Sequence, residues 1–271
     1  MDKILTDSFE TFHIRTTSGS YSSDILLICG DCLEVIEAFA FPTPKVDMLF
    51  TDPPYGTTNC KWDCPVDLGV FWPAVNGILK KGACKALFSQ TPFDKVLGCS
   101  NLRELRYEWI WEKNQATGHL NAKKMPMKAH ENILIFYDKL PTYNPQMTHG
   151  APRKVSSAAS KRNCKTGDVY GVYHATSYDS TDRYPRSVLK GPTDKQHCAL
   201  HPTQKPVWLC EKIIRTYTNP GDVVLDCFMG SASIGVACQN TGRNYIGIEK
   251  HRQWFDISRE RLLANAAICC P

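Results

Sequence analysis

Short apolar runs alternate with longer amphipathic ones along most of the chain. The runs at residues 25–29, 46–51 and 83–89 have the length and composition of buried strands. Between them, residues 32–40 and 66–82 follow the helical period. Strands that alternate with helices are typical of a parallel sheet with helices on both faces. The pattern therefore predicts an α/β fold.

The same alternation returns in the carboxyl-terminal third. A helix is predicted within residues 201–221, with Pro206 near its start and an Asn-Pro-Gly stop at its end. Two apolar runs at residues 106–113 and 131–138 are predicted to form an antiparallel pair at the end of the sheet. The remaining expected elements are strands at 222–227 and 243–249 and helices at 231–242 and 252–266.

Two stretches depart from this pattern. Residues 143–200 are dominated by Ser, Thr, Gly, Pro, Lys and Arg, which predicts an insertion or a small loop-rich lobe. Residues 1–23 are rich in Ser and Thr and are predicted to be loose. The expected organisation is a loose start followed by one catalytic domain at residues 24–271, with the insertion inside it.

Length and composition fit a globular domain with a substantial core. The chain has 271 residues, of which 42% are hydrophobic. No apolar run approaches the ~20 residues of a membrane span, and the N-terminus lacks a hydrophobic signal region. We therefore expect a cytoplasmic protein with no membrane partner.

The cysteines are numerous but do not form a clear metal or disulfide pattern. There are 13, an odd number scattered through predicted strands and helices, which favours reduced thiols. Cys29 and Cys32 form a lone CxxC with no second pair at zinc-finger spacing and no neighbouring His. Buried or incidental thiols are the favoured interpretation, zinc is the alternative, and no metal is predicted.

Positive charge is concentrated in two regions. The chain carries a net charge of +5, and residues 148–200 hold nine Lys/Arg against four Asp/Glu, so the rest is neutral. Residues 113–130 contain four lysines and no acidic residue. Clustered charge of this kind indicates a polyanionic partner, with a solvated lysine-rich loop as the alternative.

The segment TDPPYGTTNCKWD follows the predicted strand at residues 46–51. Asp52 would lie at the carboxyl end of that strand, where open α/β sheets bind ligands. Pro53 and Pro54 would fix the backbone, and Tyr55 would present a flat ring. An acceptor beside a stacking surface suits a planar ligand with an amino group, such as a nucleobase.

A second motif, DVVLDCFMGSAS, runs from a predicted strand through a glycine turn into a helix. The backbone can approach a ligand closely at Gly230, and the helix N-terminus offers free N–H groups. Glu249 ends the next predicted strand, where it could accept hydrogen bonds from ribose hydroxyls. The motif indicates a nucleotide-type cofactor, with a plain tight turn as the alternative.

Together, these motifs resemble S-adenosylmethionine-dependent DNA amino-methyltransferases of the β class. In that class the DPPY motif comes first, the target-recognition region second and the cofactor turn third, as they do here. The segments GDCLEVI, HPTQKP, KNQATGHLNAKKMPMKAHENILIFY and RYPRSVL are also similar, especially to phage and prophage members. The likeness extends over residues 24–263.

The resemblance implies a Rossmann-like methyltransferase fold with circularly permuted motif order. Its sheet would have seven mostly parallel strands with a terminal antiparallel strand, and residues 143–200 would recognise the target. The implied reaction moves a methyl group from S-adenosylmethionine to N6 of adenine in double-stranded DNA by base flipping. The alternatives are N4 of cytosine and a non-catalytic subunit that binds cofactor or DNA. A homodimer is left open.

The resemblance also implies roles for individual residues. The catalytic residues would be Asp52, Pro53, Pro54 and Tyr55. The cofactor would contact Asp31, Asp52, His201, Thr203, Lys205, Asp226, Phe228, Gly230, Ser231 and Glu249. DNA would contact Lys123, Lys124, Arg153, Lys154, Lys161 and Arg162.

Two positions depart from the usual glycine-rich turn of the class, which is close to DPFMGSGT. Cys227 replaces the proline, and Ala232 replaces the last glycine. We expect the methyl group of Ala232 either to crowd the cofactor or to restrict the turn.

Overall fold

The structure is a computed structural model that describes residues 9–18, 21–38, 46–57, 60, 63–158, 176–193 and 204–269. The chain divides into two compact units. The larger unit comprises Met1–Asn144 and Ser187–Pro271, and the smaller one comprises Pro145–Arg186.

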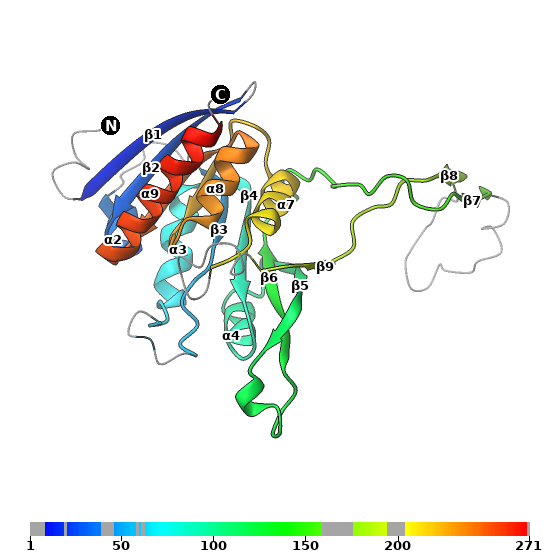
Figure 1. Cartoon of the computed structure of the whole chain (residues 1–271), viewed down its shortest axis with the longest axis horizontal. Coiled ribbons are helices and arrows are strands. Elements are labelled where there is room, and N and C mark those ends of the chain that lie inside the picture. The colour runs from blue at the N-terminus through cyan, green and yellow to red at the C-terminus, as the bar shows by residue number, and fades with distance from the viewer. Residues whose placement is uncertain are drawn as a thin grey trace. The chain divides into compact units, whose positions relative to one another are not determined.

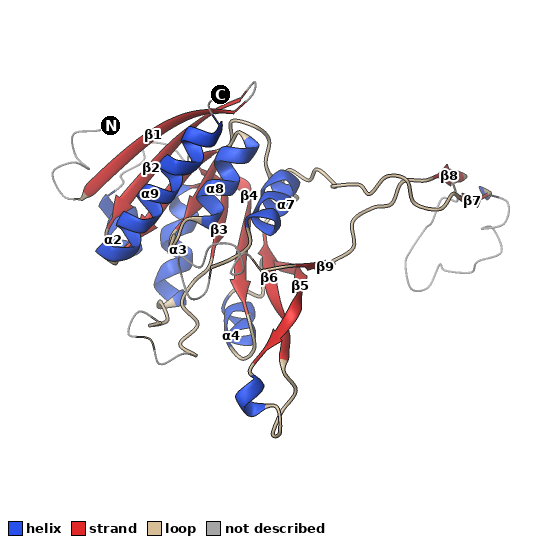
Figure 2. Ribbon diagram, in the orientation of Figure 1, coloured by secondary structure: helices blue, strands red, loops and turns tan. Residues whose placement is uncertain are grey.

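A nine-stranded sheet forms the centre of the larger unit (Figure 2). Its spatial order is β1-β2-β11-β10-β3-β4-β6-β5-β9. In chain order the strands are β1 (Glu10–Ser18), β2 (Tyr21–Cys29), β3 (Val46–Thr51), β4 (Leu79–Ser89), β5 (Leu105–Thr117), β6 (Lys128–Phe136), β9 (Val188–Gly191), β10 (Val223–Asp226) and β11 (Asn244–Glu249).

Five adjacent strands, β2, β11, β10, β3 and β4, run parallel. Strand β6 runs antiparallel to both β4 and β5, so the predicted antiparallel pair is confirmed. The α/β class and the mostly parallel sheet are confirmed as well. The strand number differs from the expected seven, because β1 and β9 add one strand at each edge.

Both additional strands come from segments without a long apolar run. Residues Glu10–Ser18 pair antiparallel with β2 and bury Ile14 and Thr16, so the prediction of a loose segment is wrong there. An edge strand buries few of its residues, and its polar sequence therefore resembles a loop. Strand β9 likewise falls inside the predicted insertion, yet it pairs with β5 of the main sheet.

Helices cover both faces of the sheet, as predicted (Figure 1). One face packs on α7 (Val207–Tyr217), α8 (Ser233–Thr241) and α9 (Arg252–Cys269). The other packs on α2 (Cys32–Ala38), α3 (Leu68–Ile78) and α4 (Phe93–Ser100). Neighbouring strand residues alternate between the two cores, with Phe50 in the first and Leu49 in the second. Among the described residues, no helix is long and apolar enough to cross a bilayer.

The last two strands of the chain insert between the first ones. Strands β10 and β11 lie between β2 and β3, which is the permuted order implied by the motifs. From β10 the chain continues to β11 on one side, whereas from β3 it continues to β4 on the other. Such a switch point opens a crevice at the carboxyl ends of the strands, where open α/β sheets bind ligands.

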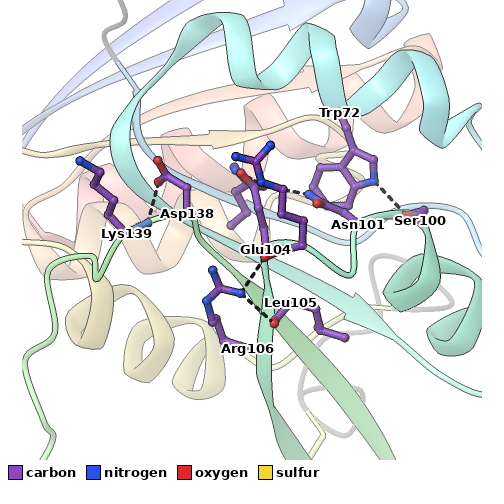
Figure 3. Close-up of polar contacts among 10 residues, drawn as sticks. Trp72, Ser100, Asn101, Glu104, Leu105, Arg106, Asp138 and Lys139 are labelled. Atoms are coloured by element: carbon purple, nitrogen blue, oxygen red, sulfur yellow. Dashed lines mark hydrogen bonds and ion pairs between the residues drawn. The ribbon is translucent and has the colours of Figure 1, made fainter.

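A buried ion pair fixes the connection from α4 into β5. Lys85 Nζ of β4 lies 2.6 Å from Glu104 Oε2. Glu104 Oε2 also accepts a 2.8 Å hydrogen bond from Asn101 Nδ2 (Figure 3). Nearby, Trp72 Nε1 of α3 donates to Ser100 Oγ at 2.9 Å. These contacts fix the starting point of the β5–β6 hairpin, whose other end reaches the site described below.

The smaller unit contains a two-stranded ribbon. Strands β7 (Lys154–Ser156) and β8 (Tyr178–Ser180) pair antiparallel, and Thr148 and Arg183 form a further bridge. The guanidinium of Arg183 donates to the carbonyl oxygens of Pro152, Ser180 and Asp182 and thereby ties the two sides of the unit together. The unit spans Pro145–Arg186, which is shorter than the insertion predicted at residues 143–200.

Candidate active site

A cavity of about 780 Å³ opens at the carboxyl ends of the parallel strands. It is lined by segments that follow four of them: β2, β3, β10 and β11. The structure thus brings together most of the residues singled out from the sequence. The cavity is lined by Asp31, Asp52, Pro53, Pro54, Tyr55, Lys205, Asp226, Phe228, Gly230, Ser231 and Glu249.

Asp52 and Tyr55 form a compact pair directly after β3. The Tyr55 hydroxyl donates to Asp52 Oδ1 at 2.7 Å, and the Tyr55 ring stacks on Phe93 with centroids 5.2 Å apart. One face of Tyr55 is therefore supported by α4. Burial raises the pKa of Asp52, against the opposing effect of the nearby Lys205 ammonium.

Lys205 lies between two carboxylates. It precedes α7, and its Nζ lies 2.9 Å from Asp52 Oδ2 and 3.0 Å from Glu131 Oε2. The side chain is buried, which disfavours the charged form, but the two carboxylates outweigh this and raise the pKa of Lys205. Lys205 was predicted to face the cofactor, whereas its ammonium here points at the DPPY carboxylate.

Glu131 and Lys113 extend this group of charges onto the β5–β6 hairpin. Glu131 begins the buried part of β6, and its Oε1 forms a very short ion pair with Lys113 of β5. Burial opposes ionisation of Glu131, but Lys205 and Lys113 together lower its pKa to about 2. Neither Lys113 nor Glu131 was among the predicted site residues, although the expected pairing of residues 106–113 with 131–138 already brought their opposite charges to the same end of the strand pair.

Asp63 closes the loop that follows the DPPY motif. It accepts hydrogen bonds from the backbone N–H groups of Gly56 at 2.8 Å and Thr57 at 2.9 Å, and it is almost fully buried. Gly56 has a φ of +66°, which glycine adopts at little cost. Sequence reasoning missed Asp63 because nothing local shows which donors its carboxylate meets.

The glycine turn is held by Glu249. Gly230 N donates to Glu249 Oε2 at 2.9 Å, and His251 N donates to Oε1 at 2.8 Å. Each carboxylate oxygen has two lone pairs, so Glu249 can accept further hydrogen bonds. Gly230 has a φ of +52°, and a Cβ placed on it would meet no protein atom within 4 Å. The backbone at Gly230 therefore leaves open space that a ligand could fill.

Asp226 joins the two central strands. Its Oδ1 accepts from Thr51 Oγ1 at 2.7 Å and from Phe228 N at 3.2 Å, and its Oδ2 accepts from Tyr245 OH at 3.0 Å. Burial raises the pKa of Asp226 to about 7. These contacts are those of a strand-end acceptor that holds the turn, which links β3 and β10 at the switch point.

Asp31 begins the segment after β2. Its Oδ1 caps α2 by accepting from Leu33 N at 3.0 Å, and its Oδ2 lies 3.1 Å from Lys250 Nζ. Although burial opposes ionisation, these hydrogen bonds lower the pKa of Asp31. The acceptor is thus oriented at the cavity wall.

The sequence belongs with known DNA-modifying proteins. The family described as DNA methylase, which covers N6 and N4 amino-methylases, matches residues 46–260. The chain belongs to this family. Its members are S-adenosylmethionine-dependent DNA methyltransferases, so the predicted family and cofactor class are confirmed at that level.

Several relatives resemble the methylase over most of its length. The type II methyltransferase M1.MboII of Moraxella bovis is 28% identical, covering 84% of this chain and 91% of the relative. The DNA adenine methyltransferase YhdJ of Escherichia coli is 27% identical over 87% and 82% of the two chains.

Solved structures agree on the fold. The crystal structure of the M1.HpyAVI–SAM complex superposes with a TM-score of 0.61 and 27% identity, covering 88% of the methylase and 98% of that chain. The cytosine-N4-specific PvuII DNA methyltransferase has the same TM-score at 15% identity, with coverage of 94% and 93%. At that identity the PvuII enzyme supports the fold alone.

Ala232 of the methylase adopts a conformation that usually belongs to glycine. Its φ is +56°, directly before α8, and its side chain is buried in the core rather than at the cavity. Left-handed backbone costs an L-residue roughly 1–2 kcal/mol. Of the two expectations for its methyl group, the structure favours a restricted turn over a crowded cofactor.

Cys227, the other departure, has a buried thiol that contacts the thiol of Cys32. Cys29, the other member of the CxxC, is partly exposed. Within the described ranges, no group of three or more His, Cys, Asp or Glu side chains has the arrangement of a metal site.

The predicted DNA-contacting residues belong to different elements of the structure. Lys123 and Lys124 are exposed near the end of the β5–β6 hairpin, and Lys154 is exposed in β7. Arg153 forms a two-pronged ion pair with Asp179, at 2.8 and 2.6 Å. The remaining predicted site residues, His201, Thr203, Lys161 and Arg162, lie outside the described residues.

Proposed function

We propose that this methylase transfers a methyl group from S-adenosylmethionine to N6 of adenine in double-stranded DNA. The observation that carries the proposal is that Asp52 and Tyr55 face the same cavity as the Gly230 turn and Glu249. One part of this cavity offers an acceptor beside an aromatic ring, and the other offers an open glycine backbone beside a carboxylate. A flat amine and a nucleoside cofactor fit these two parts.

The cofactor would be held by the segments after β2, β10 and β11. Glu249 has lone pairs for the ribose hydroxyls, Asp31 has an oriented acceptor for the adenine amino group, and Phe228 offers apolar contact. The backbone at Gly230 leaves room for close approach. When bound, S-adenosylmethionine supplies an electrophilic methyl group on a positively charged sulfur.

Asp52 would orient the amino group of the target base. An exocyclic nitrogen is a poor nucleophile because its lone pair is delocalised into the ring. Asp52 and the carbonyl of Pro53 can each accept one N–H, which favours a more tetrahedral nitrogen. Asp52 already accepts from Tyr55 and faces Lys205, so its remaining lone pairs are directed by fixed neighbours.

Tyr55 would stabilise the base outside the duplex. Flipping a base costs a few kcal/mol, and stacking on an aromatic ring offsets about 1–3 kcal/mol of this. Phe93 supports the Tyr55 ring from α4 and thereby keeps its orientation.

Adenine is favoured over cytosine by relatives and by the motif. YhdJ, named a DNA adenine methyltransferase, is 27% identical to this chain, whereas the cytosine-N4-specific PvuII enzyme supports the fold alone. The test is to express the chain in a host without DNA methylation and analyse nucleosides by mass spectrometry, with long-read mapping of the site. N6-methyladenine is expected. Detection of N4-methylcytosine instead would identify cytosine as the target base. If no methylated base were found, a non-catalytic subunit would be favoured.

Gly230→Ala should weaken S-adenosylmethionine binding by at least about tenfold. Its new methyl group would meet no protein atom but would enter the space assigned to the cofactor. Gly221→Ala is a matched control, because Gly221 has a φ of +87°, equally open surroundings and no place in the cavity wall. Both variants should lose about 1–2 kcal/mol of stability. Calorimetry that finds equal affinities for the two variants would remove Gly230 from the cofactor site.

The basic region at residues 148–200 should determine how strongly the affinity for DNA falls as the salt concentration rises. Replacing Lys154, Lys161 and Arg162 with Gln should reduce the slope of log affinity against log salt by about 0.9 for each phosphate contact removed. Arg153 should contribute less, because Asp179 already neutralises it. Lys80→Gln is the control, since Lys80 is paired with Asp47 away from the cavity. Unchanged slopes in salt titrations would show that these residues do not contact phosphates, in agreement with the alternative of a solvated basic loop.

A further inference from the structure

The β5–β6 hairpin carries one wall of the cavity outward to a tip. Trp111, Lys113 and Thr117 of β5 line the cavity, and the short 3₁₀ turn η1 (His119–Asn121) follows directly. In Figures 1 and 2 the end of this hairpin projects beyond the neighbouring strands and carries η1 and the loop that follows it. Leu120, in the middle of the turn, lies at most about 11 Å along the chain from Thr117 at the cavity wall.

Apolar side chains are exposed at this tip among positive charges. Leu120 is 87% exposed, and Met125 and Met127 are exposed to smaller extents. Residues 114–130 contain no Asp or Glu. The basic side chains in the same stretch are Lys123, Lys124 and Lys128. An exposed leucine followed within eight residues by three lysines suits a partner with an apolar interior and an anionic surface.

The tip is a defined turn. Gly118 adopts a φ of +91°, which redirects the chain out of β5. Asn121 N donates to Gly118 O at 3.0 Å, and Met125 N and Lys124 N both donate to Asn121 O, at 3.0 and 2.9 Å. Leu120 is therefore held outward by a hydrogen-bonded backbone.

We propose that Leu120 inserts into the base stack of duplex DNA and occupies the space that the target base leaves when it enters the cavity. This proposal rests on the proposed function, since it requires a flipped base. Apolar side chains such as Leu and Met are used as wedges between base steps, and an unstacked step otherwise exposes apolar base faces to water. The lysines that follow Leu120 in the chain would contact phosphates beside the step, and the cavity wall at Thr117 lies within reach of the gap.

The test compares two duplexes that differ in how easily the target base leaves the stack. Both carry the methylation site mapped as above, one fully paired and one with a mismatched base opposite the target. Leu120→Ala should reduce the single-turnover rate on the paired duplex by at least about tenfold and restore most of it on the mismatched duplex, where flipping costs less. Leu140→Ala is the matched control, because Leu140 is 80% exposed and lies outside the hairpin.

Each outcome decides the proposal. A selective defect on the paired duplex supports the wedge, and Leu120→Ser should then show the same selectivity. A wild-type rate for Leu120→Ala, an equal loss on both duplexes, or an equal loss in Leu140→Ala would overturn it. A change in oligomeric state of Leu120→Ala, measured by light scattering, would assign the tip to a second copy of the chain instead. Failure of the wild-type protein to methylate any DNA would reject the proposed function and not the wedge alone.

Discussion

Asp52→Asn should lower the rate of methyl transfer by at least about a hundredfold while S-adenosylmethionine binding changes little. Removing one preorganised hydrogen-bonding group from an active site typically costs a factor of about 10²–10³ in rate. The amide keeps the size of the carboxylate but turns one acceptor into a donor. That new donor must face Lys205, the Tyr55 hydroxyl or the amino group of the base. Each of these groups is itself a hydrogen-bond donor toward Asp52, so one hydrogen bond is lost.

The effect should appear in the chemical step. Single-turnover kinetics on the mapped duplex measure the rate, and calorimetry measures cofactor affinity separately. Asp24→Asn is the matched control, because Asp24 is exposed, pairs with Arg15, and lies at the opposite end of the parallel strands. If Asp52→Asn turned over at a near wild-type rate, the DPPY carboxylate would have no part in orienting the amine.

The predictable part of this molecule is the part whose signals are local. The strand before Asp52 and the strand before the Gly230 turn were each recognisable from a short apolar run that ends in a turn motif. Parallel strands bring their carboxyl ends to one edge, so the two motifs could be expected in one cavity even though about 175 residues separate them. The alternation of apolar and amphipathic runs likewise predicted helices on both faces of the sheet.

The rest depends on pairings between distant segments. Strand β1 is polar because it pairs on one side and buries only alternate residues, so its sequence looks like a loop. Lys205 belongs to the HPTQKP motif, which is associated with the cofactor, but its ammonium lies between the carboxylates of Asp52, directly after β3, and Glu131 of β6. Glu131 and Asp63 acquire their roles from donors that no sequence pattern specifies.

Glu131→Gln should lower the free energy of unfolding by about 3 kcal/mol at neutral pH. Glu131 is buried between the ammonium groups of Lys113 and Lys205, and breaking a buried pair by removing one partner typically costs about 3–5 kcal/mol. Lys205 keeps Asp52 after the substitution, whereas Lys113 loses the carboxylate beside it. The amide retains the shape of the side chain, so the loss reports the charge and not a cavity.

A neighbouring ion pair provides the control. Glu112 precedes Lys113 on β5 and pairs with Lys190 at 3.0 Å, but both side chains are largely exposed. Exposed pairs contribute about 0–1 kcal/mol, so Glu112→Gln should change stability by no more than that. Urea unfolding of the wild type and both variants makes the comparison. Equal losses for the two substitutions would mean that the Glu131 contacts contribute no more than a surface pair.

The pH dependence of the free energy of unfolding tests the contribution of the Glu131 charge independently. The pKa of Glu131 is about 2 in the folded protein, below the ordinary value of 4.5, because two lysines stabilise the carboxylate. A lowered pKa contributes stability that is fully present above the unfolded value and is lost as pH falls toward the folded value. The difference between wild type and Glu131→Gln should therefore stay near 3 kcal/mol down to about pH 5 and shrink steadily toward pH 2. A difference that persisted unchanged to pH 2 would show that packing, and not the charge of Glu131, stabilises this end of the hairpin.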